Sequence, residues 1–359
     1  MEPVLAGPHF ISECQFCGEK FRISAEHLNL ELPCRCLSCG ATSKTATRRF
    51  PGDILRLRKD LDTNPPKRFD IVAFEREGQA MVKRIWALPG EHVAIQSGEV
   101  LINGVLLEKT LTQFRQVAIP VLGRWEQEDT GARWSAHYPQ NNFVGGDSQQ
   151  SLTATAITDD YSCNQGLSYQ TQRVDDYAAL FTLTGRLSEQ EMQSSLRLDI
   201  QCKGRKLPIL FRSAFRKLHI GEGQEPYWEG GLLIIPNLSQ ILVVVCDERL
   251  LVSESWRHAP IYSEALASIE NRLEAWPYAE CLVHTSPNNL EDLLEVRIWR
   301  DLYLRTDTRT GAGTQEFDGA DGYFVMGDNQ PSSVDSRNGL GRVAEESLLG
   351  VAELPSMKD

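Results

Sequence analysis

Residues 69–91 read FDIVAFEREGQAMVKRIWALPGE, and this stretch decides the fold of the chain. It holds two apolar, strand-like runs with a short polar connection between them. Similar runs lie on both sides, namely ILRLR at 54–58, HVAI at 92–95 and EVLI at 99–102. Asn103-Gly104 stands between two apolar runs, which is the strongest short-range signal for a hairpin. Residues 52–107 are therefore predicted to form an all-β block with short connections.

The length of 359 residues favours two or three domains. The formal net charge of −12 argues against a protein that binds nucleic-acid phosphates, so no nucleic-acid partner is expected. The most apolar segment, 231–245, is interrupted by Pro236 and Asn237 and is predicted to form two strands. No segment resembles a signal peptide or a membrane-spanning helix, so the chain as given is expected to be soluble.

A second strand-rich block is predicted at 175–305. Leu196, Leu198 and Ile200 alternate with polar residues, which is typical of a half-buried strand, and residues 294–299 repeat the pattern. One helix is predicted over 262–276, where apolar residues share a helical face before Pro277. The number of strands favours a β-sandwich, which resembles the laminin-G and concanavalin-like sandwiches. The segment 111–174 is expected to be an irregular connection, with a loop at 145–156.

Nine cysteines fall into two sets. Four are scattered, whereas five are crowded into residues 14–39. Within the crowded set, Cys14 and Cys17 form one CxxC pair and Cys36 and Cys39 form another. Two such pairs predict a zinc ribbon with one structural zinc ion, because each pair presents two thiolates to a tetrahedral metal. Cys34 is an alternative to Cys36, and two disulfides are an alternative to zinc in an oxidising compartment.

Four motifs follow one another along the chain. They are GDIL at 52–55, RFDIVAF at 68–74, MVKRIWALPGE at 81–91 and GDNQPSSVDSR at 327–337. In this order they resemble the motif boxes of the type I signal peptidases, the S26 serine/lysine endopeptidases. The resemblance implies a mainly β, signal-peptidase-type core that is interrupted by a zinc ribbon and by a large sandwich insertion. The chain is then divided into a remnant of the serine box (1–9), the zinc ribbon (10–44), a first core segment (45–110), the irregular connection (111–174), the inserted sandwich (175–305) and a second core segment (306–359).

The resemblance assigns roles to residues by position. Lys83 matches the general base, and Ser333 matches the hydroxyl that orients the lysine. A lysine base must be neutral, and burial against Met81, Ile85 and Trp86 is expected to lower its pKa. Two further residues, Asp335 and Arg337, match the acid and base that brace the loop. Asp328 matches another box residue, with hydrogen bonding inside the loop as its alternative role. Gln330 and Pro331 stand where the family pattern has Arg-Asp, but neither is one of the positions to which the resemblance assigns a role.

The serine nucleophile of the family is missing from its usual place before Gly52. The first residues, MEPVLAGPH, match the part of the serine box that follows the serine, except for Val4 in place of threonine. We therefore expect the nucleophile to be the residue just before Met1, with the ribbon inserted behind the box. The fallback nucleophile is Ser43, and a true pseudoenzyme is a third possibility.

The resemblance implies a serine endopeptidase that removes signal peptides from exported preproteins with a Ser/Lys dyad. It implies no cofactor for catalysis. It also implies attachment to the cell membrane through an anchor upstream of Met1, with the catalytic domain on the extracytoplasmic face. The chain as given, without the serine, is expected to be inactive. The alternative is a catalytically inactive, S26-like binding protein that uses the ribbon and the sandwich for interaction; cleavage of special envelope substrates is a weaker third hypothesis.

Overall fold

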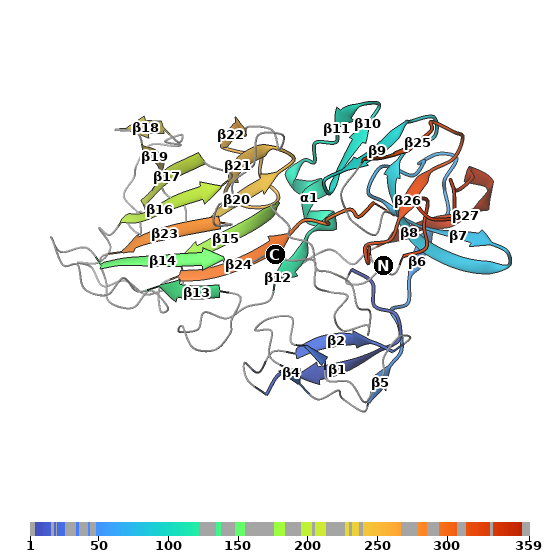
Figure 1. Cartoon of the computed structure of the whole chain (residues 1–359), viewed down its shortest axis with the longest axis horizontal. Coiled ribbons are helices and arrows are strands. Elements are labelled where there is room, and N and C mark those ends of the chain that lie inside the picture. Colours follow the sequence, from blue (N-terminus) through green and yellow to red (C-terminus); the bar gives the residue numbers. More distant parts are fainter. Residues whose placement is uncertain are drawn as a thin grey trace.

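The structure is a computed structural model of the whole chain. It describes residues 4–15, 18, 20–25, 34–35, 42–43, 48–121, 134–137, 148–154, 176–183, 195–202, 205–212, 227–229, 232–236, 240–266, 279–285, 294–306, 314–330 and 333–353. Figure 1 shows a small N-terminal unit below, a large pair of sheets on the left, and a second group of sheets on the right.

The group on the right is built around a five-stranded antiparallel sheet with the order β26-β8-β7-β27-β6. The two strands nearest the C-terminus therefore pair with strands from residues 56–87. The hairpin between β7 and β8 turns at Glu77 and Gly78, whose positive φ values of 52° and 75° suit the tight two-residue turn. The strands are β6 (Arg56–Arg58), β7 (Ile71–Arg76), β8 (Gln79–Ala87), β26 (Phe324–Met326) and β27 (Leu348–Glu353), the last preceded by the 3-10 turn η5 (Glu345–Ser347).

A four-stranded sheet completes this group, which we call the core. Its order is β11-β10-β9-β25, and its strands are β9 (Val93–Gln96), β10 (Glu99–Ile102), β11 (Val105–Leu106) and β25 (Thr314–Phe317). Asn103 and Gly104 have φ values of 52° and 80°, so the predicted hairpin is confirmed. A buried cluster that includes Trp86, Ile95 and Phe324 joins the two sheets.

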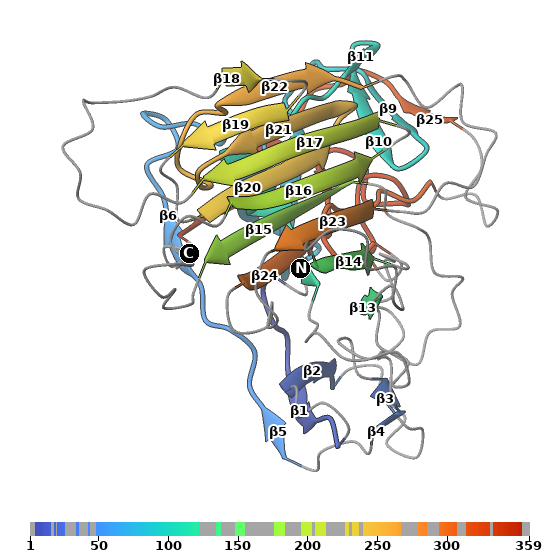
Figure 2. The same cartoon turned by 90° about the vertical axis from the view of Figure 1, so that its left-hand side faces the viewer.

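Between β11 and β25 the chain forms a separate pair of sheets, which we call the insertion. One of its sheets has six strands in the order β12-β24-β15-β20-β21-β22, and the other has seven in the order β13-β14-β23-β16-β17-β19-β18. Figures 1 and 2 show them as two layers, with the six-stranded sheet on the side of the core. The six strands are β12 (Ile119–Val121), β15 (Tyr177–Leu183), β20 (Gln240–Cys246), β21 (Arg249–Ser253), β22 (Tyr262–Ala265) and β24 (Leu294–Arg300). The seven are β13 (Trp134–His137), β14 (Ser148–Ala154), β16 (Ser195–Cys202), β17 (Arg205–Arg212), β18 (Tyr227–Glu229), β19 (Leu232–Pro236) and β23 (Ala279–Thr285).

The prediction of a mainly β chain is confirmed, as are the strands at 196–200 and 294–299 and the two strands of the apolar segment, the first of which ends at Pro236. The likeness of the insertion to laminin-G or concanavalin-like sandwiches stays a prediction.

The helix predicted over 262–276 is wrong for its first residues. Tyr262–Ala265 is strand β22, which pairs with Arg249–Val252 at the edge of the six-stranded sheet. The apolar residues have helical spacing, but the segment pairs with β21 instead of forming a helix. Nothing in the local sequence indicates this pairing. Residues 267–278 lie outside the described part of the chain.

Regular structure also occurs where an irregular connection is predicted. Helix α1 (Leu111–Val117) begins at Thr110, whose hydroxyl accepts the amide of Gln113 while the Gln113 side chain accepts the amide of Thr110. This capping box is a signal that the sequence offered. Ser148–Ala154, within the predicted loop at 145–156, is strand β14 between β13 and β23. Polar strands of this kind form because the neighbouring strands satisfy their backbone groups.

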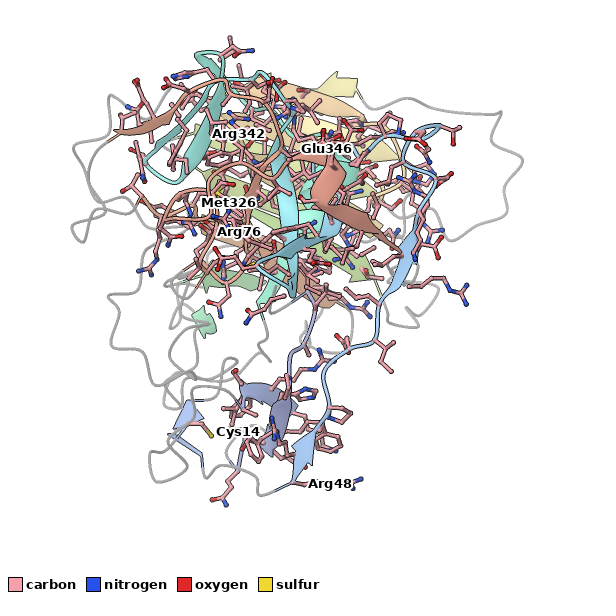
Figure 3. The ribbon with its side chains drawn as sticks, turned by 90° about the vertical axis from the view of Figure 1, so that its right-hand side faces the viewer. Cys14, Arg48, Arg76, Met326, Arg342 and Glu346 are labelled. Atoms are coloured by element: carbon pink, nitrogen blue, oxygen red, sulfur yellow. The ribbon has the colours of Figure 1, made fainter. Side chains whose placement is uncertain are left out.

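The N-terminal unit comprises His9–Phe50. Strands β1 (His9–Glu13), β2 (Lys20–Ser24) and β5 (Arg49–Phe50) form one sheet, and β3 (Cys34–Arg35) pairs with β4 (Thr42–Ser43). His9 and Phe50 are antiparallel partners, so the chain enters and leaves the unit side by side. Figures 1 and 3 show the unit apart from the sheets of the core.

No helix within the described ranges has both the length and the apolar character needed to cross a membrane.

Candidate active site

Lys83 and Ser333 meet at one edge of the five-stranded sheet. The Nζ atom of Lys83 donates a hydrogen bond of 3.0 Å to Oγ of Ser333, although 250 positions separate the two residues. The contact forms because β26 pairs with β8, opposite Arg84 and Ile85, and the following loop turns back over Lys83. The prediction that these side chains approach each other is confirmed.

Gly327 is what allows the loop to come this close. A Cβ atom at this position would lie 2.8 Å from Cβ of Ser333 and 3.3 Å from Nζ of Lys83, and it would overlap Oγ of Ser333. Any side chain would therefore push the hydroxyl away from the amine. The glycine of the GDNQ motif is required by the spacing of the Lys83–Ser333 pair.

The environment of Lys83 favours the neutral amine. Desolvation by burial is the largest cause and lowers the pKa of Lys83. Asp335 and Asp328 act in the opposite direction because their negative charges raise this pKa, and the charge of Arg337 lowers it. Burial outweighs the two carboxylates, so the pKa of Lys83 stays below its ordinary value.

Strand alternation decides which apolar residues accompany Lys83. Met81 and Ile85 share a face of β8 with Lys83, and both belong to the cluster that contains Val325. Trp86 points to the other face and packs with Phe69 in a separate cluster. The expectation that Trp86 forms part of the wall around Lys83 is therefore wrong.

Asp335 and Arg337 brace the loop that carries Ser333. The guanidinium of Arg337 donates through Nε to Oδ1 of Asp335 (2.9 Å) and through Nη2 to Oδ2 (2.8 Å). Oδ2 of Asp335 also accepts the amide of Gly327 at 3.1 Å. Burial alone would raise the pKa of Asp335, but the hydrogen bonds and charge of Arg337, aided by Gly327 and Ser333, bring this pKa below its ordinary value. Asp335 is thus held as a carboxylate beside Ser333.

Gln330 supplies further support to this loop. Its side-chain amide donates to the carbonyl oxygen of Gly327, and its Oε1 accepts Nη1 of Arg337. Arg337 also donates to the carbonyl oxygen of Arg305, at the point where the chain returns from the insertion. Gln330 therefore keeps the loop hydrogen-bonded, although it departs from the family pattern at this position.

Asp328 has a partner that is not among the predicted site residues. Arg84 donates through Nε and Nη2 to the two carboxylate oxygens of Asp328, at 2.9 and 2.8 Å, and Nη1 donates to the carbonyl oxygen of Phe69 at 3.0 Å. Both side chains are fully buried. The signal was present, because an arginine inside an apolar strand needs a carboxylate partner. Asp328 thus fixes the start of the loop to the strand that carries Lys83.

The start of the chain lies against the Gly52 motif. The amide of Ala6 donates to Oδ2 of Asp53 at 2.8 Å, and the amide of Asp53 donates back to the carbonyl oxygen of Ala6 at 2.8 Å. A Cβ at Gly52 would be 3.1 Å from that same carbonyl oxygen. Residues 4–8 and 51–53 are therefore packed together although the N-terminal unit separates them in sequence.

Ser43, the fallback nucleophile, lies in the N-terminal unit. It is in β4, opposite Cys34. Figures 1 and 3 show this unit apart from β8, so the structure does not bring Ser43 to Lys83.

Two of the crowded cysteines are described. Cys14 and Cys34 are both buried in the small core of the N-terminal unit, together with Phe10, Phe21 and Ile23. The thiol of Cys34 lies 3.8 Å from Oγ of Ser12. Cys17, Cys36 and Cys39 lie outside the described residues, so the predicted ligand set is not tested.

A family model described as signal peptidase, peptidase S26, matches residues 40–163 and 301–357, together just over half of the chain. The chain belongs to this family. The two matched ranges contain all nine strands of the core, and with them Lys83 and the loop of Ser333. The interval between the matched ranges, 164–300, holds most strands of the insertion.

Individual S26 relatives match over shorter stretches. Signal peptidase I of Leptolyngbya laminosa is 40% identical over 103 residues, which cover 23% of this chain and 51% of that protein. Signal peptidase I P of Bacillus subtilis subsp. natto is 59% identical over 34 residues, or 10% of this chain and 18% of that protein. Signal peptidase I T of Bacillus subtilis strain 168 is 58% identical over 31 residues, or 9% and 16%. The chain thus spans about half the length of the first relative and under a fifth of the other two.

Proposed function

We propose that this S26 protein is a serine endopeptidase that removes signal peptides from exported preproteins with a Ser/Lys dyad. The observation that supports it best is the hydrogen bond from Lys83 to Ser333, because it holds the desolvated lysine of β8 against the loop that matches the family's motif. Membership in the S26 family and the names of the signal peptidase I relatives support the substrate class.

Lys83 is the general base in this mechanism. Its neutral amine takes the proton from the nucleophilic serine as the serine oxygen attacks the scissile carbonyl carbon. The tetrahedral intermediate collapses to an acyl-enzyme when Lys83 returns the proton to the leaving amine. A water molecule, deprotonated by the same amine, then hydrolyses the ester and restores the serine. Ser333 orients Nζ of Lys83, while Asp335 and Arg337 support Ser333.

The nucleophile is a serine directly before Met1. The segment that matches the serine box lies beside Asp53, and Ala6 forms two hydrogen bonds with this residue. This packing is expected if the box and the Gly52 motif are one continuous feature into which the N-terminal unit has been inserted. We further propose that an apolar anchor precedes the serine and attaches the protein to the cell membrane, with the core on the extracytoplasmic face.

The N-terminal unit is proposed to hold one structural zinc ion through Cys14, Cys17, Cys36 and Cys39, with Cys34 as the alternative to Cys36. Cys14 fits a ligand role because its thiol lies inside a unit whose apolar core contains few residues. A tetrahedral ion would cross-link such a unit where apolar burial is insufficient. No cofactor is assigned to catalysis.

Signal peptides would bind in extended form along a free strand edge of the core, with small residues near the scissile bond. The insertion beside the core would restrict the access of folded proteins to the site. A non-catalytic protein that binds such segments is the competing function, and the following experiment separates the two.

The test uses two extended proteins, each with an apolar anchor of about 20 residues before Met1. One carries serine directly before Met1 and the other carries alanine. Each is incubated in detergent or vesicles with several preproteins, and the cleavage site is mapped by mass spectrometry. The serine form should cleave after small residues, and the alanine form should not.

Lys83→Met in the serine form should lower kcat/KM by about 10²–10⁴-fold, because it removes the base but preserves the shape of the side chain. Cleavage by the alanine form at the same rate would reject the proposed nucleophile and would make Ser43→Ala the next variant. Binding of preproteins without cleavage by the serine form would favour the non-catalytic function.

A further inference from the structure

The chain returns from the insertion to the core through residues 301–306, which follow β24 directly and which we call the return segment. Leu302 and Leu304 of this segment are 4% and 2% exposed. Both belong to the buried cluster that also contains Met326, the last residue of β26. The next residues, 327–338, form the loop that carries Ser333, which we call the Ser333 loop. The return segment is therefore packed into the core beside the strand that leads to this loop.

The backbone of the return segment is also attached to the core. The amide of Leu304 donates to the carbonyl oxygen of Gly98, in the turn between β9 and β10, at 3.2 Å. A Cβ atom at Gly98 would lie only 2.5 Å from the ring of Tyr303, so the glycine permits this close approach. Leu304 is thus held by its side chain and by its backbone at the same time.

The residue after Leu304 contacts the Ser333 loop through Arg337, whose guanidinium has five N–H groups. Nε and Nη2 donate to the carboxylate of Asp335 at 2.9 and 2.8 Å. Nη2 also donates to the carbonyl oxygen of Gln330 at 3.3 Å, and Nη1 donates to Oε1 of Gln330 at 2.5 Å. These four bonds stay within the Ser333 loop. The fifth leaves it, because Nη1 also donates to the carbonyl oxygen of Arg305 at 2.7 Å.

We propose that the return segment positions the Ser333 loop for catalysis. Leu304 anchors the segment in the core, and the carbonyl oxygen of Arg305 next to it fixes the guanidinium of Arg337. Arg337 is only 8% exposed, so an N–H group that lost this acceptor would be left unsatisfied inside the protein. Leu304 is thereby a positioning residue of the site described above, and this inference rests on the proposed function. It gives the base of the insertion a part in the arrangement of Lys83 and Ser333.

The charge of Arg337 links this contact to the chemistry of Lys83. Burial is the largest cause that lowers the pKa of Lys83, Asp335 raises this pKa, and the charge of Arg337 lowers it. If the guanidinium moved away while Asp335 stayed in place, the pKa of Lys83 would rise. A displaced return segment should therefore change the pH dependence of cleavage, which a general loss of stability would not do.

The first test is amide hydrogen exchange at single-residue resolution on the full chain, which needs no nucleophile. Leu304→Ala removes the anchor of the return segment and leaves Arg337 unchanged. The amides of Gly327 and Arg337 report on the loop, because both donate to the carboxylate of Asp335 at 3.1 Å. Their exchange should become about tenfold faster, the factor that corresponds to the loss of one hydrogen bond. Leu304→Met conserves the volume of the side chain and should restore the slow exchange.

Val93→Ala is the matched control. Val93 is buried in the same cluster as Leu304, but it lies at the opposite end of β9 from Gly98. Urea unfolding of each variant gives the exchange that occurs through global unfolding, which is subtracted. The loop amides should then exchange in Val93→Ala as in the wild type. Equal acceleration in Leu304→Ala and Val93→Ala, or none in Leu304→Ala, would overturn the proposal. If Leu304→Ala does not fold, Leu304→Val takes its place against the same control.

The second test measures cleavage by the serine-extended protein. In Leu304→Ala the acidic limb of the profile of kcat/KM against pH should move to higher pH, whereas in Val93→Ala it should stay in place. A limb that does not move in Leu304→Ala would contradict the positioning role. If the serine-extended protein does not cleave at all, the proposed function fails, and the exchange of the loop amides alone decides whether the return segment positions the loop.

Discussion

At the scale of single residues, the proposed mechanism depends on the lowered pKa of the Lys83 amine. Lys83 lies in the row of β8 that also contains Met81 and Ile85, and its hydrogen bond to Ser333 directs Nζ toward the loop. Two carboxylates nearby, Asp335 and Asp328, would favour the charged amine, yet burial prevails. Asp335, Arg337 and Ser333 thus lie in one loop beside Lys83, and the pKa of the lysine stays below its ordinary value.

The pH dependence of cleavage tests this balance. In the serine-extended protein, kcat/KM should rise with pH until the lowered pKa of Lys83 is passed, because the protonated amine cannot act as a base. Asp335→Asn removes the negative charge that raises this pKa and leaves the positive charge of Arg337, which lowers it. The acidic limb of the pH–rate profile should therefore move to lower pH. A limb that stays in place or moves upward would show that another group controls it.

At the scale of elements, the active loop is attached to β8 by the buried pair of Arg84 and Asp328. The pair crosses from the strand of the base to the start of the loop, and Gly327 lies between it and the Lys83–Ser333 contact. Two neighbouring residues of β8 thus contact the same loop in different ways: Lys83 donates a hydrogen bond to Ser333, and Arg84 forms the buried ion pair with Asp328.

Removal of one partner of this pair should be costly. Arg84→Met alone should lower the free energy of unfolding by about 3–5 kcal/mol, because Asp328 would be left as an unpaired buried charge. The double variant Arg84→Met/Asp328→Asn should lose less than the sum of the single variants. Urea unfolding followed by tryptophan fluorescence gives these values. Additive losses would mean that the two side chains are not energetically coupled.

The N-terminal unit is the element in which metal content can be measured directly. The purified protein should contain about one equivalent of zinc, and Cys14→Ser should remove it, because a tetrahedral site needs all four ligands. Cys34→Ser distinguishes the two ligand sets: the zinc is retained if Cys36 is the ligand and lost if Cys34 is. Mass mapping that finds these cysteines joined in disulfides would favour the oxidised alternative.

At the scale of the whole molecule, both additions to the core enter and leave at neighbouring points. His9 pairs with Phe50 at the base of the N-terminal unit, and Lys109 forms an ion pair with Asp301 at the base of the insertion. The core can therefore keep its own strand order while carrying two large additions. Figure 1 shows the strands of the insertion beside the core.

Excision of the N-terminal unit tests this independence. Replacement of residues 10–49 by Asn-Gly would join the paired residues His9 and Phe50 through a two-residue hairpin turn. Cleavage by the serine-extended protein and its thermal unfolding midpoint should change little, whereas zinc should be lost completely. Loss of cleavage with an intact fold would instead show that the unit takes part in substrate binding.

The sequence predicted the features of this molecule that depend on local patterns. The Asn103-Gly104 hairpin, the alternating strands and the mainly β class follow from neighbouring residues, and Lys83 and Ser333 follow from motifs. Strand β22 and the Arg84–Asp328 pair could not be read in this way, because each depends on a partner that is distant in sequence. The ion pair of Lys109 with Asp301 could not be read from the sequence for the same reason, because the two residues meet only after the insertion has folded.

The separation of 250 positions between Lys83 and Ser333 has a consequence for synthesis of the protein. At about 5–20 residues per second, roughly 12–50 s pass on the ribosome between the appearance of the lysine and that of the serine. During this interval β8 has no β26 to pair with, and the loop that positions the amine does not exist. A nascent chain is therefore without its assembled site until almost all of it has been made, which delays any proteolysis until synthesis is nearly complete.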